Sequence, residues 1–331
     1  MPEVLTGSSK EREREKPRGS YAKRVQERML DASLVIFAVI LCVVFSIWSP
    51  YFFAFRNFMN ILIAVSMIGV IATGMTVVII AKGIDLSVGS TMAVAGCIET
   101  MLIANMKLPW WVGMSGALGA GLLIGLFNGI LVTRFRIVPF IATLGTMNMV
   151  RGLACIVTNG QAIYTSNPQV EFLGAGRIMG IPVPALILIC CFVVMWWFTR
   201  YTVYGRYVFS VGGNRTASRL AGINVERIEI LLFTVTGGLS ALAGMIMIGL
   251  SSTSMPSAGD GYNLDVITAV YLGGNSSEGG EGSLWRTMLG VMIIGIINNG
   301  MALLSVQPYW QTFAKGCLLV VAVIFDRFRR R

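Results

Sequence analysis

The chain has 331 residues, of which 55% are hydrophobic and 13% carry a charge, and its mean hydropathy is +0.73. Because soluble domains have about 25% charged residues, this composition excludes a water-soluble globular protein and predicts one embedded in a membrane. The formal net charge of +10 is spread over separate segments of the chain, which predicts no nucleic-acid binding.

The chain begins with a charged segment, residues 1–30. Its stretch KEREREKPRGSYAKR alternates positive and negative side chains and has no apolar core of the kind that a cleaved signal peptide needs. We therefore predict a disordered cytoplasmic tail over 1–30, followed by a single transmembrane domain over 31–327.

Apolar runs separated by short polar breaks follow one another along the rest of the chain. They cover residues 33–48, 60–81, 86–105, 110–133, 138–158, 183–199, 228–250, 264–274, 284–304 and 309–325. A hydrocarbon layer of about 30 Å needs about 20 helical residues, so the short eighth run predicts a broken or re-entrant element. The predicted fold class is all-α, a polytopic integral membrane protein with about ten transmembrane helices.

Lysine and arginine collect in alternate breaks. With a cytoplasmic amino terminus, the cytoplasmic breaks contain Lys82, Arg134, Arg136, the loop 200–227, Arg286 and the basic end 327–331. The opposite breaks contain Arg56, Lys107 and Arg177. Since short cytoplasmic loops collect positive side chains, we predict that both termini are cytoplasmic and that membrane lipid surrounds the helices.

The six cysteines all fall inside apolar runs, and the chain has no histidine. They show no metal-ligand spacing, so we interpret them as small core residues without disulfides and predict no metal site.

The longest cytoplasmic break, 200–227, contains a helix signal of its own. Asn214 is a typical N-cap residue and Gly222 a typical helix stop. The apolar residues between them share one face, namely Ala217, Leu220 and Ala221. Two interpretations fit this pattern: a helix that lies in the lipid headgroup region, or a docking helix that meets another protein.

Five stretches, spread in order over nearly the whole chain, carry a family resemblance. They are GMTVVIIAKGIDLSVGS (74–90), PFIATLGTM (139–147), YGRYVFSVGGNRTASRLAGI (204–223), GYNLDVITAVYLGG (261–274) and YWQTFAKGCLLVVAVIFDR (309–327). Together they resemble the bacterial ATP-binding cassette permeases for simple sugars, the ribose, allose, arabinose and xylose group.

The resemblance implies the permease subunit of an importer that moves a monosaccharide, a ribose-like pentose or a hexose, across the bacterial inner membrane. It implies three protein partners: a cytoplasmic ATP-binding cassette ATPase, a periplasmic or extracytoplasmic sugar-binding protein, and a second permease copy in a homodimer. The chain has no GxxxxGK[ST] sequence, so we expect a transport subunit that is no enzyme and has no cofactor.

The same resemblance assigns the contact with the ATPase to the loop 200–227. The residues concerned are Gly205, Arg206, Gly212, Gly213, Asn214, Arg219, Leu220 and Gly222. One departure from the family pattern is the acidic sequence GGNSSEGGEGS after the eighth run, which contains Glu278 and Glu281. It leaves open which partner surface this loop meets.

The stretch KGIDLSVGS is predicted at the inner surface, between the second and third runs. Asp85 and Ser87 fit a helix N-cap, while Gly83 and Gly89 allow the backbone to bend and pack closely. The alternative to a structural cap is a gate or an ATPase contact.

Polar residues within the runs are candidates for the translocation path, because ionisable and amide groups are costly in a membrane. The candidates for the path are Asn128, Asn148, Arg151, Asp265, Asn298 and Asn299. Each amide could instead join helices, and Asp265 could cap the eighth element. Arg151 and Lys315 could form structural ion pairs, and Glu99 is a further buried ionisable candidate.

Two glycine-rich stretches, GALGAGLLIG (116–125) and GGLSALAG (237–244), are interpreted as helix-packing surfaces, or alternatively as a homodimer interface.

Two other functions stay open. A secondary transporter driven by protons or sodium would use Asp265, Glu99 and Arg151 and need no ATPase. A permease of the same class could carry a nucleoside or an autoinducer. An integral-membrane enzyme has no support, since the sequence contains no assembled nucleophile, metal or paired-carboxylate motif.

Overall fold

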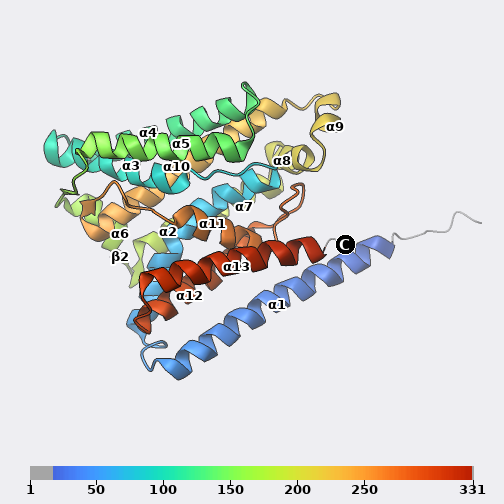
Figure 1. Cartoon of the computed structure of the whole chain (residues 1–331), viewed down its shortest axis with the longest axis horizontal. Helices are drawn as coiled ribbons and strands as arrows, with labels where there is room; N and C mark the ends of the chain where they lie inside the picture. The colour runs from blue at the N-terminus through green and yellow to red at the C-terminus, as the bar shows by residue number, and fades with distance from the viewer. Residues whose placement is uncertain (1–17, 330–331) are drawn as a thin grey trace, which may run out of the picture.

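The computed structural model describes residues 18–329, which are folded almost entirely into helices (Figure 1). Residues 1–17 of the predicted tail lie outside the described residues. The rest of that tail is corrected to helix, because α1 begins at Arg18 and continues to Trp48. Extending an existing helix costs far less than nucleating a new one, which accounts for the continuation of the apolar span into charged sequence.

Eight helices within the described range are long and apolar enough to cross a membrane. They are α1 (Arg18–Trp48), α2 (Phe55–Ile80), α3 (Val88–Thr100), α4 (Trp110–Thr133), α5 (Pro139–Thr158), α7 (Val183–Tyr201), α10 (Val225–Ser251) and α12 (Leu284–Leu303). Helix α3 reaches this length because the π-helical turn η1 (Met101–Asn105) extends it.

The remaining two predicted runs form shorter apolar helices. Helix α11 (Tyr262–Leu272) has 11 residues, which at 1.5 Å per residue is about half of the hydrocarbon thickness. The expected short eighth element is therefore confirmed. Helix α13 (Pro308–Arg329) is apolar over Pro308–Ile324.

The other elements are short connections. They are α6 (Pro168–Ala175), α8 (Val203–Gly213), α9 (Arg215–Leu220), β1 (Ile163–Tyr164), β2 (Arg177–Ile178), β3 (Ile181–Pro182) and β4 (Thr253–Ser254). The strands pair antiparallel as β1 with β4 and β2 with β3. The all-α fold class is confirmed.

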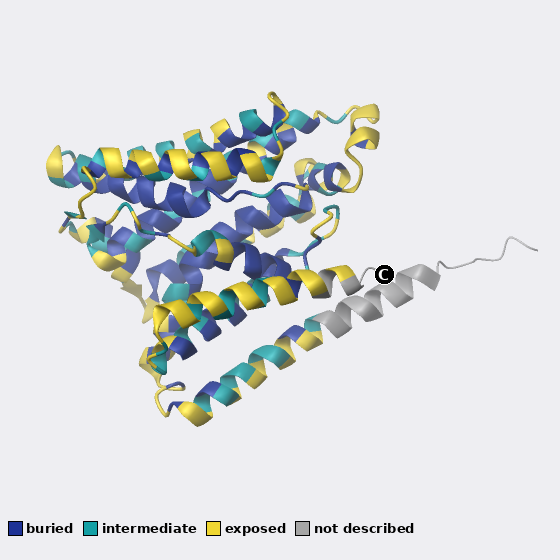
Figure 2. Cartoon of the chain, in the orientation of Figure 1, coloured by how far each residue is buried: buried dark blue, intermediate teal, exposed yellow. Residues whose placement is uncertain are grey.

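Helices α2 and α10 form the centre of the bundle. Helix α2 is buried along most of its length, and α10 packs against α2, α3, α4 and α6 (Figure 2). Few residues are buried in Asp31–Trp48 of α1, in α5 and in α7, and many of their large apolar side chains are exposed. Apolar outer faces of this kind suit contact with lipid.

The two ends of the bundle differ. The helices α8 and α9 lie at one end, together with the α4–α5 connection and the carboxyl end of α13 (Figure 1). The elements α6 and β2 lie at the opposite end.

The two glycine-rich stretches pack against each other, on α4 and α10. A Cβ atom on Gly121 would lie 2.5 Å from the carbonyl oxygen of Gly237, and one on Gly125 would lie 2.2 Å from that of Phe233. The backbones of the two helices therefore touch, which confirms the packing interpretation. Dispersion contacts between such closely packed backbones stabilise helix pairs in lipid, where hydrophobic burial adds little.

This contact gives a first testable prediction. Gly121→Ala is expected to lower the free energy of unfolding by about 1–3 kcal/mol, because the new methyl group meets backbone atoms that cannot move aside. Gly119→Ala on the same helix is the matched control, since a Cβ there has no neighbour within 4 Å. Thermal unfolding of the purified protein in detergent measures both variants. Equal melting temperatures for the two would contradict the tight α4–α10 contact.

The cysteines are only partly core residues, which corrects the prediction. Cys97 is buried, whereas three others are exposed, namely Cys155, which lines the cavity beside α5, Cys190 and Cys317. All six are free thiols. A cysteine is apolar enough to face lipid as readily as a protein core. Its place in an apolar run therefore does not show whether it is buried in the protein or exposed on its surface.

Candidate functional site

The loop 200–227 forms two short helices, α8 and α9. The hydroxyl oxygen of Thr202 accepts a hydrogen bond from the Gly205 backbone N–H at 3.0 Å and so caps α8. Asn214 Oδ1 accepts one from the Ala217 backbone N–H at 2.9 Å and caps α9. Helix α9 ends before Gly222, whose φ of +82° requires glycine. The predicted cap and stop are confirmed, and α8 was missed.

The apolar side of α9 points away from the protein. Leu220 is 86% exposed, and Ala217 and Ala221 are also exposed. Ser218 lies on the opposite side, where it is buried and its hydroxyl is 3.1 Å from that of Ser210 on α8. The helix is therefore held by its polar side and presents its apolar side outward.

An ion pair joins α9 to the central helix α10. The Arg215 guanidinium donates to the Glu229 carboxylate, whose side chain is 8% exposed. A second, longer pair joins Arg219 to Glu226 at 3.8 Å. These pairs connect α9 to α10, which also packs against α2, α3, α4 and α6.

Helix α8 packs tightly on the end of α2 and on the acidic loop 275–283. A Cβ atom on Gly212 would lie 1.8 Å from the Ile80 carbonyl oxygen, and that oxygen accepts a hydrogen bond from the Gly280 backbone N–H at 2.8 Å. The exposed Glu278 and Glu281 therefore lie beside α8. Sequence reasoning noted the two glutamates but did not place them on the same surface as α8 and α9.

The stretch KGIDLSVGS is largely buried by other parts of the protein, while its predicted place at the cytoplasmic side of the membrane stays a prediction. Of its residues only Lys82 is exposed. Asp85 Oδ1 accepts hydrogen bonds from the Ser87 backbone N–H at 2.9 Å and from its hydroxyl at 2.6 Å. Asp85 thus closes a turn ahead of α3 and does not cap the helix itself.

The Asp85 turn is tied to α4. The amide of Asn128 donates to Ser87 Oγ at 2.8 Å, and both residues are fully buried. Close backbone packing occurs at Gly89, where a Cβ would lie 2.4 Å from the Gly259 carbonyl oxygen. A buried aspartate costs free energy unless hydrogen-bond donors surround it. This requirement explains why the Asp85 motif packs next to Asn128.

A second buried polar group joins α11, α12 and α13. Lys315 Nζ donates to Asp265 Oδ2 at 2.8 Å, and the Asn298 amide donates to the same oxygen at 3.2 Å. Asp265 is 3% exposed and does not cap α11. Asn299 forms a reciprocal amide pair with Asn57 at 2.8 and 2.9 Å.

The candidates for the path therefore divide into two groups. Four of them form hydrogen bonds to other segments of the same chain, namely Asn128, Asp265, Asn298 and Asn299. Asn148 and Arg151 instead line a cavity of about 440 Å³ beside α5. Glu99 lies in neither place, since it is fully buried and neither carboxylate oxygen has a hydrogen-bond partner within residues 18–329.

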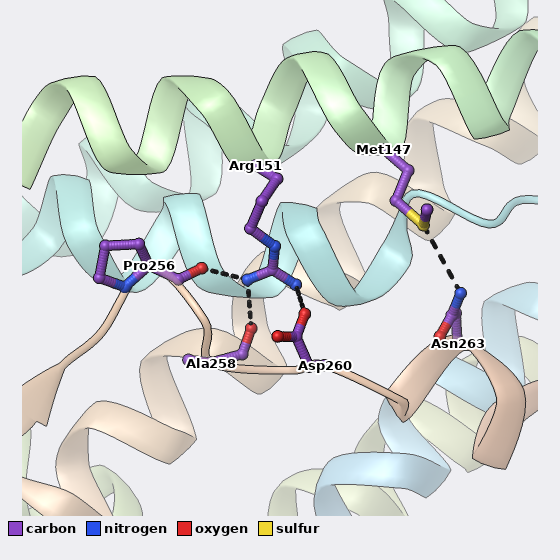
Figure 3. A network of polar contacts seen from close by, with 6 residues as sticks. All are labelled: Met147, Arg151, Pro256, Ala258, Asp260 and Asn263. Atoms are coloured by element: carbon purple, nitrogen blue, oxygen red, sulfur yellow. Dashed lines mark hydrogen bonds and ion pairs between the residues drawn. The ribbon is translucent and has the colours of Figure 1, made fainter. Parts of the chain in front are cut away.

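Arg151 reaches from α5 to the segment 255–261, which connects β4 to α11 (Figure 3). Its guanidinium donates to the carbonyl oxygens of Pro256 and Ala258, the second at 2.8 Å, and forms an ion pair with Asp260. Of the two alternatives left open for Arg151, the ion pair is present, with a partner in a loop and not in a span, and a role in the path stays a prediction.

Comparison with known proteins identifies the family. Residues 57–323 match the family described as branched-chain amino acid transport system / permease component. The ribose import permease protein RbsC of Haemophilus influenzae is 39% identical over 308 residues, covering 92% of this chain and 94% of that protein. RbsC of Bacillus subtilis is 40% identical over 290 residues, covering 87% and 90%.

A permease for a second pentose is nearly as similar. The L-arabinose transport system permease protein AraH of Escherichia coli is 36% identical over 298 residues, covering 90% of each chain. These relatives are transport components, in agreement with the polytopic helical fold. The chain therefore belongs to this permease family, among the permeases of sugar ATP-binding cassette transporters.

Proposed function

We propose that the chain is the membrane subunit of an importer that carries a monosaccharide, a ribose-like pentose or a hexose, across the bacterial inner membrane. A separate ATP-binding cassette ATPase drives it by docking on α8 and α9. The observation that carries this proposal is the apolar side of α9, which is fixed by a cap and an ion pair yet leaves Leu220 86% exposed. A bound helix with an apolar anchor is a common form of protein recognition.

The α9 end of the bundle faces the cytoplasm in this proposal. The α4–α5 connection, with Arg134 and Arg136, lies at the same end as α8 and α9, whereas Arg177 of β2 lies at the other (Figure 1). This charge asymmetry supports a cytoplasmic α9, with both termini on that side. The opposite end then receives sugar from an extracytoplasmic binding protein.

The energy for transport comes from ATP hydrolysis by the partner ATPase, because the sequence has no phosphate-binding GxxxxGK[ST] motif. Two permease copies form the transporter, and a homodimer gives each copy one docking surface for an ATPase domain. Rocking of the copies opens the path to each side in turn.

Reconstitution in liposomes tests this function. Uptake of radiolabelled ribose or arabinose is expected when the permease is combined with its cognate cassette ATPase, its binding protein and ATP. The control omits ATP or replaces it with a proton or sodium gradient. Accumulation under an ion gradient alone would overturn the proposal in favour of a secondary transporter. Uptake of a nucleoside in preference to every monosaccharide would overturn the assigned substrate class.

A further inference from the structure

The cavity beside α5 is an open hollow at the protein surface, where charged and polar groups share one wall. Arg151, Asn148, Ser90, Ser257 and Asp260 all contribute to its wall. Its volume of about 440 Å³ lies within the range of small-molecule sites.

One of these groups is a buried hydroxyl that the fold leaves unused. Ser90 is 1% exposed, and its Oγ has no hydrogen-bond partner among the described residues. A buried polar atom without a partner costs free energy in the unliganded protein. Because Ser90 is one of the residues that line the cavity, a small shift of its side chain lets a ligand hydroxyl satisfy Oγ.

The charged pair also keeps hydrogen-bonding capacity for a ligand. Arg151 has five N–H donors and uses three of them, on Pro256, Ala258 and Asp260. Asp260 Oδ1 accepts from Arg151, while Oδ2 accepts from none of the described residues and the side chain is 68% exposed. Arg151 and Asp260 thus offer a ligand both hydrogen-bond donors and acceptors on the same wall of the cavity.

The wall is held in position before any ligand arrives. Arg151 ties the segment 255–261 to α5, and Gly259 touches the backbone of Gly89 on α3 from the other side. Such preorganisation reduces the entropy lost on binding.

From these observations we propose that this cavity is a binding subsite for a neutral polyol, which contacts Ser90, Arg151 and Asp260 through adjacent hydroxyl groups. Hydroxyls both donate and accept, so they match a wall that contains a guanidinium, a carboxylate and a serine hydroxyl. The ion pair cancels the charge of Arg151, so the site favours a neutral ligand over a phosphate or a carboxylate. The assignment of this polyol as the transported monosaccharide rests on the proposed function.

Two substitutions test the subsite. Ser90→Ala removes a hydroxyl that makes no hydrogen bond to any residue the structure describes, and Asp260→Asn removes the carboxylate charge while keeping its shape. Each is expected to lower ATP-driven uptake of radiolabelled ribose or arabinose about tenfold, at a saturating concentration of binding protein. Binding of the same sugar to the purified permease, measured by scintillation proximity, is expected to weaken by a similar factor.

The matched control is Thr91→Val. Thr91 is also 1% exposed with an unpartnered hydroxyl, but it does not line the cavity, so wild-type uptake is expected. Uptake by Ser90→Ala equal to that of the control overturns the subsite, even if Asp260→Asn is impaired, because Asp260 also holds the loop. If the wild-type protein imports no monosaccharide at all, the proposed function fails instead.

Discussion

Replacing Lys315 with methionine is expected to lower the free energy of unfolding by about 3 kcal/mol, a fall in melting temperature of about 6 °C. The lysine neutralises Asp265, whose side chain is 4% exposed. Without it, the carboxylate keeps one hydrogen bond, from Asn298, and its other oxygen is already buried without a partner. An uncompensated charge in the protein interior is among the most destabilising changes a single substitution makes.

The opposite substitution and the double variant separate the charge from the packing. Asp265→Asn is expected to cost less, because Lys315 is 24% exposed and its long chain can turn its ammonium group toward water. The double variant Lys315→Met, Asp265→Asn is expected to recover most of the stability lost by Lys315→Met. Thermal unfolding in detergent measures all three. A double variant less stable than Lys315→Met would contradict a charge-based mechanism.

Local signals predicted the short helix α9 well. Asn214 and Gly222 act within a few residues of their own positions, since a cap needs a nearby backbone N–H and a positive φ needs glycine. The short α11 was also predictable, because a count of apolar residues decides whether a run can cross the membrane. Neither prediction depends on which helices become neighbours.

The partners of interior polar groups were not predictable in the same way. Asp85 meets Asn128, and Asp265 meets Lys315, 50 residues further along the chain. An apolar run shows that a polar residue lies within a helix but not which neighbour the bundle supplies. For that reason the sequence grouped six polar residues as one path, without showing that four of them form hydrogen bonds to other segments of the chain.

The residues that line the cavity at Arg151 could not be grouped from the sequence either. Sequence reasoning selected Arg151 because it interrupts an apolar run, but its ion-pair partner Asp260 lies in a break more than 100 residues away. Ser90 carried no signal of its own, since a serine in a helix most often bonds to its own backbone. Its unused hydroxyl became visible only once α3, α5 and the segment 255–261 were placed together.

Replacing Leu220 with aspartate is expected to reduce ATP-driven uptake at least about hundredfold, while the melting temperature of the permease stays unchanged. The side chain is 86% exposed in the chain alone, so the fold loses little when it becomes charged. In the docked state proposed here, the new carboxylate would enter an apolar contact at a cost of several kcal/mol, and each 1.4 kcal/mol is a factor of ten. Uptake and ATP hydrolysis in liposomes, with co-purification of the ATPase, measure the effect.

Leu220→Met keeps the apolar volume and is expected to retain wild-type uptake. Wild-type uptake by Leu220→Asp would instead favour a helix that lies on the lipid surface and meets no motor protein.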